Sequence, residues 1–211
     1  MLEQRVIPSE ALELRAETEE ERRLSGYGIV YNRKSQLLGG LFREVILPGA
    51  ASEILQSNPD IQCAYNHDTK YLFGRTKSGT LTLEEDISGV RYTANPPDSQ
   101  WAKDALISIQ RGDIDGSSFT FAVDPDGEKW LEQEDGTYLR EIHKFAAIGE
   151  MGPVSNPAYL DATTNVRSIE EVYESNIARL RAQDEQCEIE QARARRVRDA
   201  ELLKIQLGGK K

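Results

Sequence analysis

The sequence has few of the residues that build disulfides and metal centres. Its 211 residues include two cysteines, Cys63 and Cys187, and two histidines, His67 and His143. No Cys-x-x-Cys pair occurs, so the usual spacings of a structural zinc site are absent. A reducing compartment is the simplest interpretation of so few cysteines. We expect neither a metal nor a cofactor.

Long apolar runs and an excess of basic residues are also missing. No stretch approaches the ~20 apolar residues that cross a bilayer, and the first twenty residues carry charges throughout instead of an apolar signal core. Membrane insertion and secretion by a signal peptide are therefore not expected. The net charge of −10 repels phosphate backbones, which argues against direct nucleic-acid binding. Neither a GxxxxGK[ST] loop nor a GxGxxG motif indicates nucleotide chemistry.

The composition changes near Arg167. Residues 168–211 contain nine acidic and nine basic residues, no proline, and glycines only at 208 and 209. Acidic residues gather in the first half of this tail and arginines in the second, which favours the helix dipole. We therefore predict two domains, a globular body over residues 1–167 and a long, mostly exposed helical extension over residues 168–211.

The body contains short runs of β-forming residues separated by Gly- and Asp-rich turns. The predicted strands are 12–16, 26–31, 43–48, 62–67, 80–86, 90–95, 118–123 and 138–148. Two helices are expected, at 49–57 and 97–113, where Asp98 or Ser99 can cap the second and Gly112 can end it. The fold class is mainly β or α+β, a barrel or sandwich with helices on the outside.

Two side chains of the body have the properties of a nucleophile and a base. His67 follows a short strand, between the polar residues Asn66 and Asp68. In GSSFTFAV, alternation puts Phe119 on an apolar face and Ser118 on the smaller, more polar one, whereas Ser117 shares the apolar face. A serine needs a base to accept its proton, and His67 is the natural candidate.

A catalytic histidine usually has a third group that orients it. Glu150, which precedes a turn containing Pro153, is one candidate, and His143 and Asp68 are the others. Spacing alone does not rank them.

Five segments in this order resemble the prohead maturation proteases of tailed bacteriophages. They are GYGIVYN, REVILPGAA, NHDTKYLFGRTKSGTLTLEED, GDIDGSSFTF and EMGPVSNPAY followed by DATTNVR, and the resemblance extends over about residues 12–167. That family is similar in fold to the assemblins of herpesviruses. The resemblance therefore implies a closed β-barrel surrounded by helices, with the helical tail appended.

The resemblance also implies the catalytic residues. It makes Ser118 the nucleophile and His67 the base, with Glu150 as third member and His143 as its rival, because assemblins use a second histidine. Two residues depart from the family pattern: Gly152 replaces a common serine, and Thr120 replaces a common glycine, which is expected to narrow the substrate cleft. Arg75 and Arg140 are further candidates for stabilising the oxyanion, although surface ion pairs are the commoner role for such residues.

The same resemblance implies a serine endopeptidase that acts in the host cytoplasm, inside the prohead. Its expected substrates are the scaffolding part of the major capsid protein and the protease itself, and the assemblin analogy suggests a homodimer. One alternative is a catalytically idle capsid-assembly or scaffolding protein. Another is a small-ester hydrolase, which the lack of a GxSxG motif disfavours.

Overall fold

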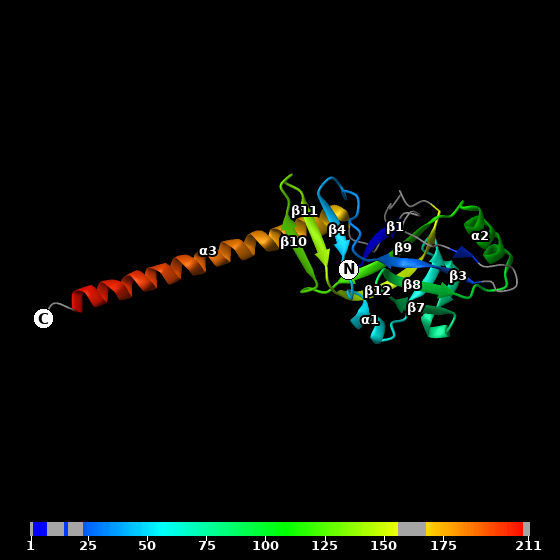
Figure 1. Cartoon of the computed structure of the whole chain (residues 1–211), viewed down its shortest axis with the longest axis horizontal. Helices are drawn as coiled ribbons and strands as arrows, with labels where there is room; N and C mark the ends of the chain where they lie inside the picture. Colours follow the sequence, from blue (N-terminus) through cyan, green and yellow to red (C-terminus); the bar gives the residue numbers. More distant parts are fainter. Residues whose placement is uncertain (1, 8–14, 17–22, 156–167, 209–211) are drawn as a thin grey trace. The chain divides into compact units, whose positions relative to one another are not determined.

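The computed structural model describes residues 2–7, 15–16, 23–155 and 168–208, with the side chains of the last helix described to residue 198 (Figure 1). The chain divides into two compact units, Met1–Ser168 and Ile169–Lys211. The first unit holds the sheets and two short α-helices, and the second is the helix α3 (Ile169–Gly208). Within the described residues, no helix has both the length and the apolar composition needed to cross a membrane.

In the described residues of the first unit, twelve strands form three sheets. The five-stranded sheet has the order β1 (Glu3–Ile7), β9 (Gly116–Val123), β12 (Phe145–Val154), β5 (Gln62–Tyr65) and β6 (Asp68–Arg75). The four-stranded sheet has the order β2 (Arg15–Ala16), β3 (Leu24–Val30), β8 (Gly89–Ala94) and β7 (Leu81–Glu85). The three-stranded sheet has the order β10 (Glu128–Glu132), β11 (Tyr138–Ile142) and β4 (Phe42–Ile46).

The prediction of a closed barrel is wrong. In the described residues each sheet is open, since no ladder of hydrogen bonds joins its two outer strands. The sheets instead pack through side chains around a common core. At one such contact, Gly28 of β3 lies so close to β12 that a Cβ atom would come within 2.5 Å of Met151 Sδ. The α+β class does fit the structure.

The aromatic face of β9 forms part of this core. Phe119 and Phe121 stack with ring centroids 4.9 Å apart, and Phe145 packs edge-on against Phe121 at 5.2 Å. The predicted alternation in β9 is present, but residues 116–121 are buried on both faces. Both serines of the strand are therefore inside the protein.

Several element boundaries differ from the sequence-based prediction. The strand predicted at 138–148 is two strands, β11 and β12, because the chain leaves the three-stranded sheet at His143 and Lys144. Strands β1, β6 and β10 were not predicted. The helices α1 (Ser52–Gln56) and α2 (Gln100–Arg111) lie inside the predicted segments, and Gly112 ends α2 in the left-handed conformation as expected. A short 3₁₀ helix, η2 (Thr76–Ser78), follows β6.

Candidate active site

His67 lies in a two-residue turn between β5 and β6. Tyr65 pairs with Asp68 across the turn, and both central residues have positive φ, 50° at Asn66 and 59° at His67. Positive φ at both centres is the signature of the hairpin turn that best matches strand twist, although Gly is the usual second residue. A side chain in this conformation costs about 1 kcal/mol, so the surrounding structure must hold it.

Asn66 fastens this turn to the end of β12. Its backbone N–H donates to the Pro153 carbonyl at 3.1 Å, and its side-chain oxygen accepts the Ser155 N–H at 2.9 Å. Its side-chain nitrogen donates to Ser155 Oγ at 3.1 Å. These three hydrogen bonds fix the position from which the His67 ring projects.

Ser118 lies in β9, paired with Val6 of β1 on one side and Gly152 of β12 on the other. Its Oγ is 2.7 Å from His67 Nε2, although the two residues are 51 positions apart in sequence. Ser117 points the other way, and its Oγ donates to the Gly152 carbonyl at 3.2 Å. The geometry thus separates the two serines as the alternation predicts.

Glu150 lies on the far side of the imidazole. Its Oε1 is 3.4 Å from His67 Nδ1, an ion-pair contact, and within the described residues neither atom has a hydrogen-bond partner. A bulge in β12 aims this side chain, because the register with β9 shifts between Ile148 and Glu150 so that Glu150 faces Thr120. Residues that face each other in paired strands share one face of the sheet, which puts Glu150 on the Ser118 face.

The two departures from the family pattern lie on this same face. Gly152 is opposite Ser118, and a Cβ atom there would come within 2.4 Å of the Ala64 carbonyl oxygen of β5. Glycine is therefore the residue that fits this close approach of β5. Thr120 is opposite Glu150 and only 9% exposed, so its side chain fills space on the same face as Ser118.

The other candidates for the third group lie elsewhere. The His143 side chain is 44% exposed, and its Nε2 is 3.8 Å from Glu141 Oε2. Asp68 Oδ1 accepts the backbone N–H of Lys70 at 2.9 Å. Within the described residues, no hydrogen bond or ion pair connects either of them to Ser118 or His67.

The two arginines considered for the oxyanion have other partners. Arg75 pairs with Asp60 at 2.5 Å on the surface. Arg140 is buried and binds three carboxylates, those of Glu3, Glu44 and Glu128. Burial alone would lower the pKa of Arg140, but the hydrogen bond to Glu3 and the nearby negative charges outweigh it and raise the pKa.

Two residues of the site were missed by the sequence reasoning, and both belong to β1. Gln4 Nε2 is 2.7 Å from His67 Nε2 and 3.5 Å from Ser118 Oγ. Ser118 Oγ donates to the backbone carbonyl of Arg5 at 2.9 Å. The alternating burial of β1 could not be recognised in the sequence, because its buried positions include the charged residues Glu3 and Arg5.

Cys63 is near the site but is a poor nucleophile. It is fully buried in β5, and burial together with the negative charge of Glu150 raises the pKa of its thiol. At neutral pH the thiol is therefore protonated, whereas the thiolate is the reactive form. Among the described residues, no group of three or more His, Cys, Asp or Glu side chains is placed to hold a metal ion.

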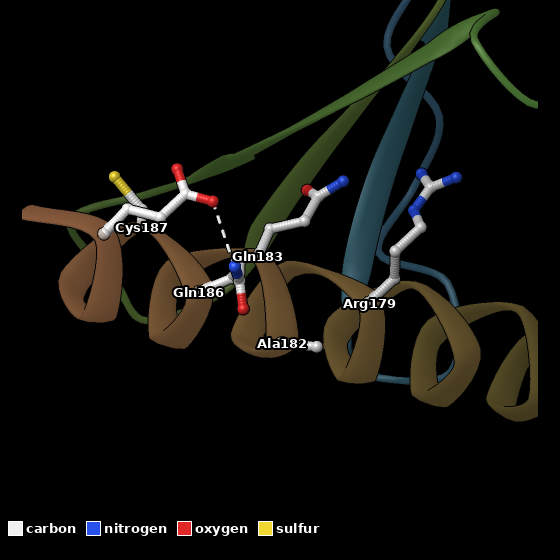
Figure 2. A pocket seen from close by; sticks show the side chains of 6 residues that line it. Arg179, Ala182, Gln183, Gln186 and Cys187 are labelled. Carbon is white, nitrogen blue, oxygen red and sulfur yellow. Dashed lines mark hydrogen bonds between the residues drawn. The ribbon is translucent and has the colours of Figure 1, made fainter. Parts of the chain in front are cut away.

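A hollow on the second unit is unrelated to these residues. Figure 2 shows its lining, which comes from α3 alone: Arg179, Ala182, Gln183, Gln186, Cys187 and Glu190. Gln186 Nε2 donates to Glu190 Oε1 at 2.9 Å, a contact between successive turns of an exposed helix. This lining offers no nucleophile–base pair.

Comparison with known proteins supplies the family. The model of the caudovirus prohead serine protease family matches residues 10–175, a range that includes His67, Ser118 and Glu150 but not β1. No curated protein and no solved structure matches the chain. Since the matched range covers most of the 211 residues, the chain belongs to the caudovirus prohead serine protease family.

Proposed function

We propose that this serine protease cleaves the scaffolding part of the major capsid protein, and its own chain, inside the prohead in the host cytoplasm. The observation that carries the proposal is the line of three groups on one face of the sheet. Ser118 Oγ is 2.7 Å from His67 Nε2, and His67 Nδ1 is 3.4 Å from Glu150 Oε1. This order of groups supports the proposal, because serine proteases place a nucleophile, a base and an orienting acid in the same succession.

The proposed reaction begins with proton transfer from Ser118 Oγ to His67 Nε2. Oγ then attacks the scissile carbonyl carbon, and the resulting tetrahedral intermediate collapses when His67 Nε2–H protonates the leaving amine. Water, deprotonated by His67, attacks the acyl-enzyme and releases the second product and Ser118. Glu150 accepts the Nδ1–H of His67 throughout, which holds the ring in place and stabilises the imidazolium.

The second unit has a separate proposed role. Residues 181–198 of α3 are all exposed, and the charges of the tail balance. We assign this extension to association with helical segments of the scaffold, and residues 1–167 to catalysis. A chain truncated after Arg167 should enter proheads less efficiently, and equal incorporation would refute this role. A homodimer stays an expectation from the assemblin analogy.

Intact mass over time, with the capsid protein co-expressed, tests the proposed activity. The wild-type chain should convert both itself and the capsid protein to defined fragments, and Ser118→Ala should leave both intact. Ser117→Ala is the matched control, because this adjacent buried serine faces away from His67 and should retain cleavage. Fragments that form equally with Ser118→Ala would rule out Ser118, and unprocessed capsid protein with all three chains would favour the idle scaffolding protein.

A further inference from the structure

The nucleophile is fully covered in this structure. Ser118 has no exposed surface, and β1 lies along the outer edge of β9 (Figure 1). In this pairing Val6 is opposite Ser118. A peptide substrate cannot reach Ser118 Oγ while this arrangement persists. We propose that the outer edge of β9 is the binding site for the extended peptide segment that is cleaved, and that β1 occupies this edge in the resting chain. This inference rests on the proposed protease function.

Groups of β1 engage both reacting atoms of the proposed catalytic pair. When His67 is neutral and carries its proton on Nδ1, facing Glu150, its Nε2 has one lone pair. The Gln4 amide, 2.7 Å away, donates to that lone pair, and Ser118 then directs its hydroxyl proton to the Arg5 carbonyl, 2.9 Å away. Gln4 thus competes with Ser118 for the base, so β1 keeps the pair inactive.

The position of β1 is also similar to that of a substrate. Proteins commonly bind extended peptides by adding them as a strand to a sheet edge. β1, a segment of the same chain, is added to the edge of β9 in this way. It pairs antiparallel with β9 over five residue pairs, from Glu3–Phe121 to Ile7–Ser117. It places a backbone carbonyl against Ser118, but the oxygen of Arg5 accepts the hydroxyl hydrogen, so this contact is not an attack geometry. A cleaved peptide must present its carbonyl carbon to Oγ instead.

Release of β1 would leave no buried charge without a partner. Glu3 and Arg5 hold the strand down through buried ion pairs with Arg140 and Glu44, at 2.6 and 2.9 Å. These two residues carry opposite charges and would leave together. Arg140 would keep Glu44 at 2.8 Å and Glu128 at 2.6 Å. Because an unpaired buried charge is the main penalty in breaking such clusters, exchange of β1 for a peptide is feasible.

The same cluster suggests which peptides fit best. With β1 displaced, Glu44 lacks the guanidinium of Arg5, and Arg140 lacks the carboxylate of Glu3. A peptide with an acidic residue two positions before a basic one would restore both pairs, as the sequence LEQRVI of residues 2–7 does. The predicted ligand is therefore an extended segment with an acidic-x-basic pattern.

The reactivity of Ser118 toward a fluorophosphonate probe tests the inference in the full chain. Gln4→Leu removes the amide at similar size and should speed labelling about fivefold, as expected for the loss of one ordinary hydrogen bond. The matched control is Gln56→Leu, at an exposed residue that ends α1, and it should label at the wild-type rate. Unchanged labelling of Gln4→Leu would overturn the inference. Slower labelling would also overturn it, and would indicate that Gln4 positions His67 or stabilises the oxyanion.

A second measurement does not depend on catalysis. A chain lacking residues 1–7, shown to be folded by circular dichroism, should bind a fluorescent LEQRVI peptide by anisotropy and bind a peptide with alanine at the Glu3 and Arg5 positions more weakly. Equal binding of the two peptides, or none, would overturn the inference. If the peptide binds but the probe never labels Ser118, the proposed protease function fails, while the proposal that the β9 edge binds extended peptides is retained. Should the shortened chain not fold, the Gln4→Leu comparison decides.

Discussion

Gly152 of β12 and Ala64 of β5 approach each other so closely that no side chain fits between them. A Cβ atom on Gly152 would come within 2.4 Å of the Ala64 carbonyl oxygen. The two strands run parallel here, and β5 leads directly into the turn that carries His67. The separation of these strands therefore sets the distance between His67 and Ser118.

Gly152→Ala should separate β12 from β5 and move His67 away from Ser118. Overpacking of this kind costs about 1–3 kcal/mol of unfolding free energy, which urea denaturation measures. Probe labelling of Ser118 should fall in the same variant. Ala146→Ser, at an exposed position of the same strand, is the control and should change neither quantity. Wild-type stability in Gly152→Ala would show that β5 adapts without cost.

Glu150→Gln should reduce activity less than Ser118→Ala does. Glutamine keeps the size of the side chain but removes the charge that stabilises the imidazolium, and loss of the orienting acid costs about 10⁴-fold in kcat. The rate of capsid-protein cleavage measures this effect. His143→Ala is the comparison, since this exposed histidine pairs only loosely with Glu141, at 3.8 Å. A larger loss in His143→Ala than in Glu150→Gln would favour the second-histidine alternative.

The sequence predicts strands in which apolar and polar side chains clearly alternate. It does not predict a strand whose buried side chains are charged and paired with residues far away in the sequence. β9 was expected because small and aromatic residues alternate in SSFTFAV. β1 was missed because Glu3 and Arg5 look solvent-exposed in the sequence, and only their pairing with Arg140 and Glu44 makes their burial tolerable. Because β1 was not predicted, the contact between Gln4 and Ser118 was not predicted either.

Two other features depend on contacts that local sequence does not specify. Closure of a barrel requires hydrogen bonds between the outer strands of a sheet. The β propensity of a segment does not specify which strand edges pair, so the closed barrel was expected from the family analogy alone, and that expectation was wrong. The Asn66–His67 turn lacks the glycine that usually marks a two-residue hairpin, so the sequence indicated the end of a strand there. The pairing of His67 with Ser118 was expected from the residues and from the resemblance, while the contact with Glu150 required the bulge in β12.

Alkylation with iodoacetamide should distinguish the two cysteines. Cys187 is exposed on α3 and should react in the folded chain. Cys63 is buried, and its raised thiol pKa means that the thiol stays protonated well above neutral pH, so it should react only after unfolding. Peptide mapping measures both sites. Cleavage activity should survive modification of Cys187, and rapid modification of Cys63 in the native protein would show that β5 opens readily.

Arg140→Met should destabilise the body far more than Arg75→Met. Arg140 is 1% exposed, and its removal takes the guanidinium away from Glu3, Glu44 and Glu128, although Arg5 still pairs with Glu3 and Glu44. Breaking a buried ion pair from one side costs about 3–5 kcal/mol, whereas Arg75 pairs with Asp60 at the surface and its loss should change little.

The pH dependence of Arg140→Met provides a further check. The pKa of Arg140 is raised from an already high value, so in the wild type this group stays protonated and its stabilising contribution is constant from pH 5 to 9. In Arg140→Met the carboxylates of Glu3, Glu44 and Glu128 lack its positive charge and repel one another more strongly, and acid, which neutralises carboxylates, relieves that repulsion. The difference in unfolding free energy between wild type and variant should therefore shrink in acid. A difference that is equal at pH 4 and pH 7 would mean that lost packing, and not charge, accounts for the effect.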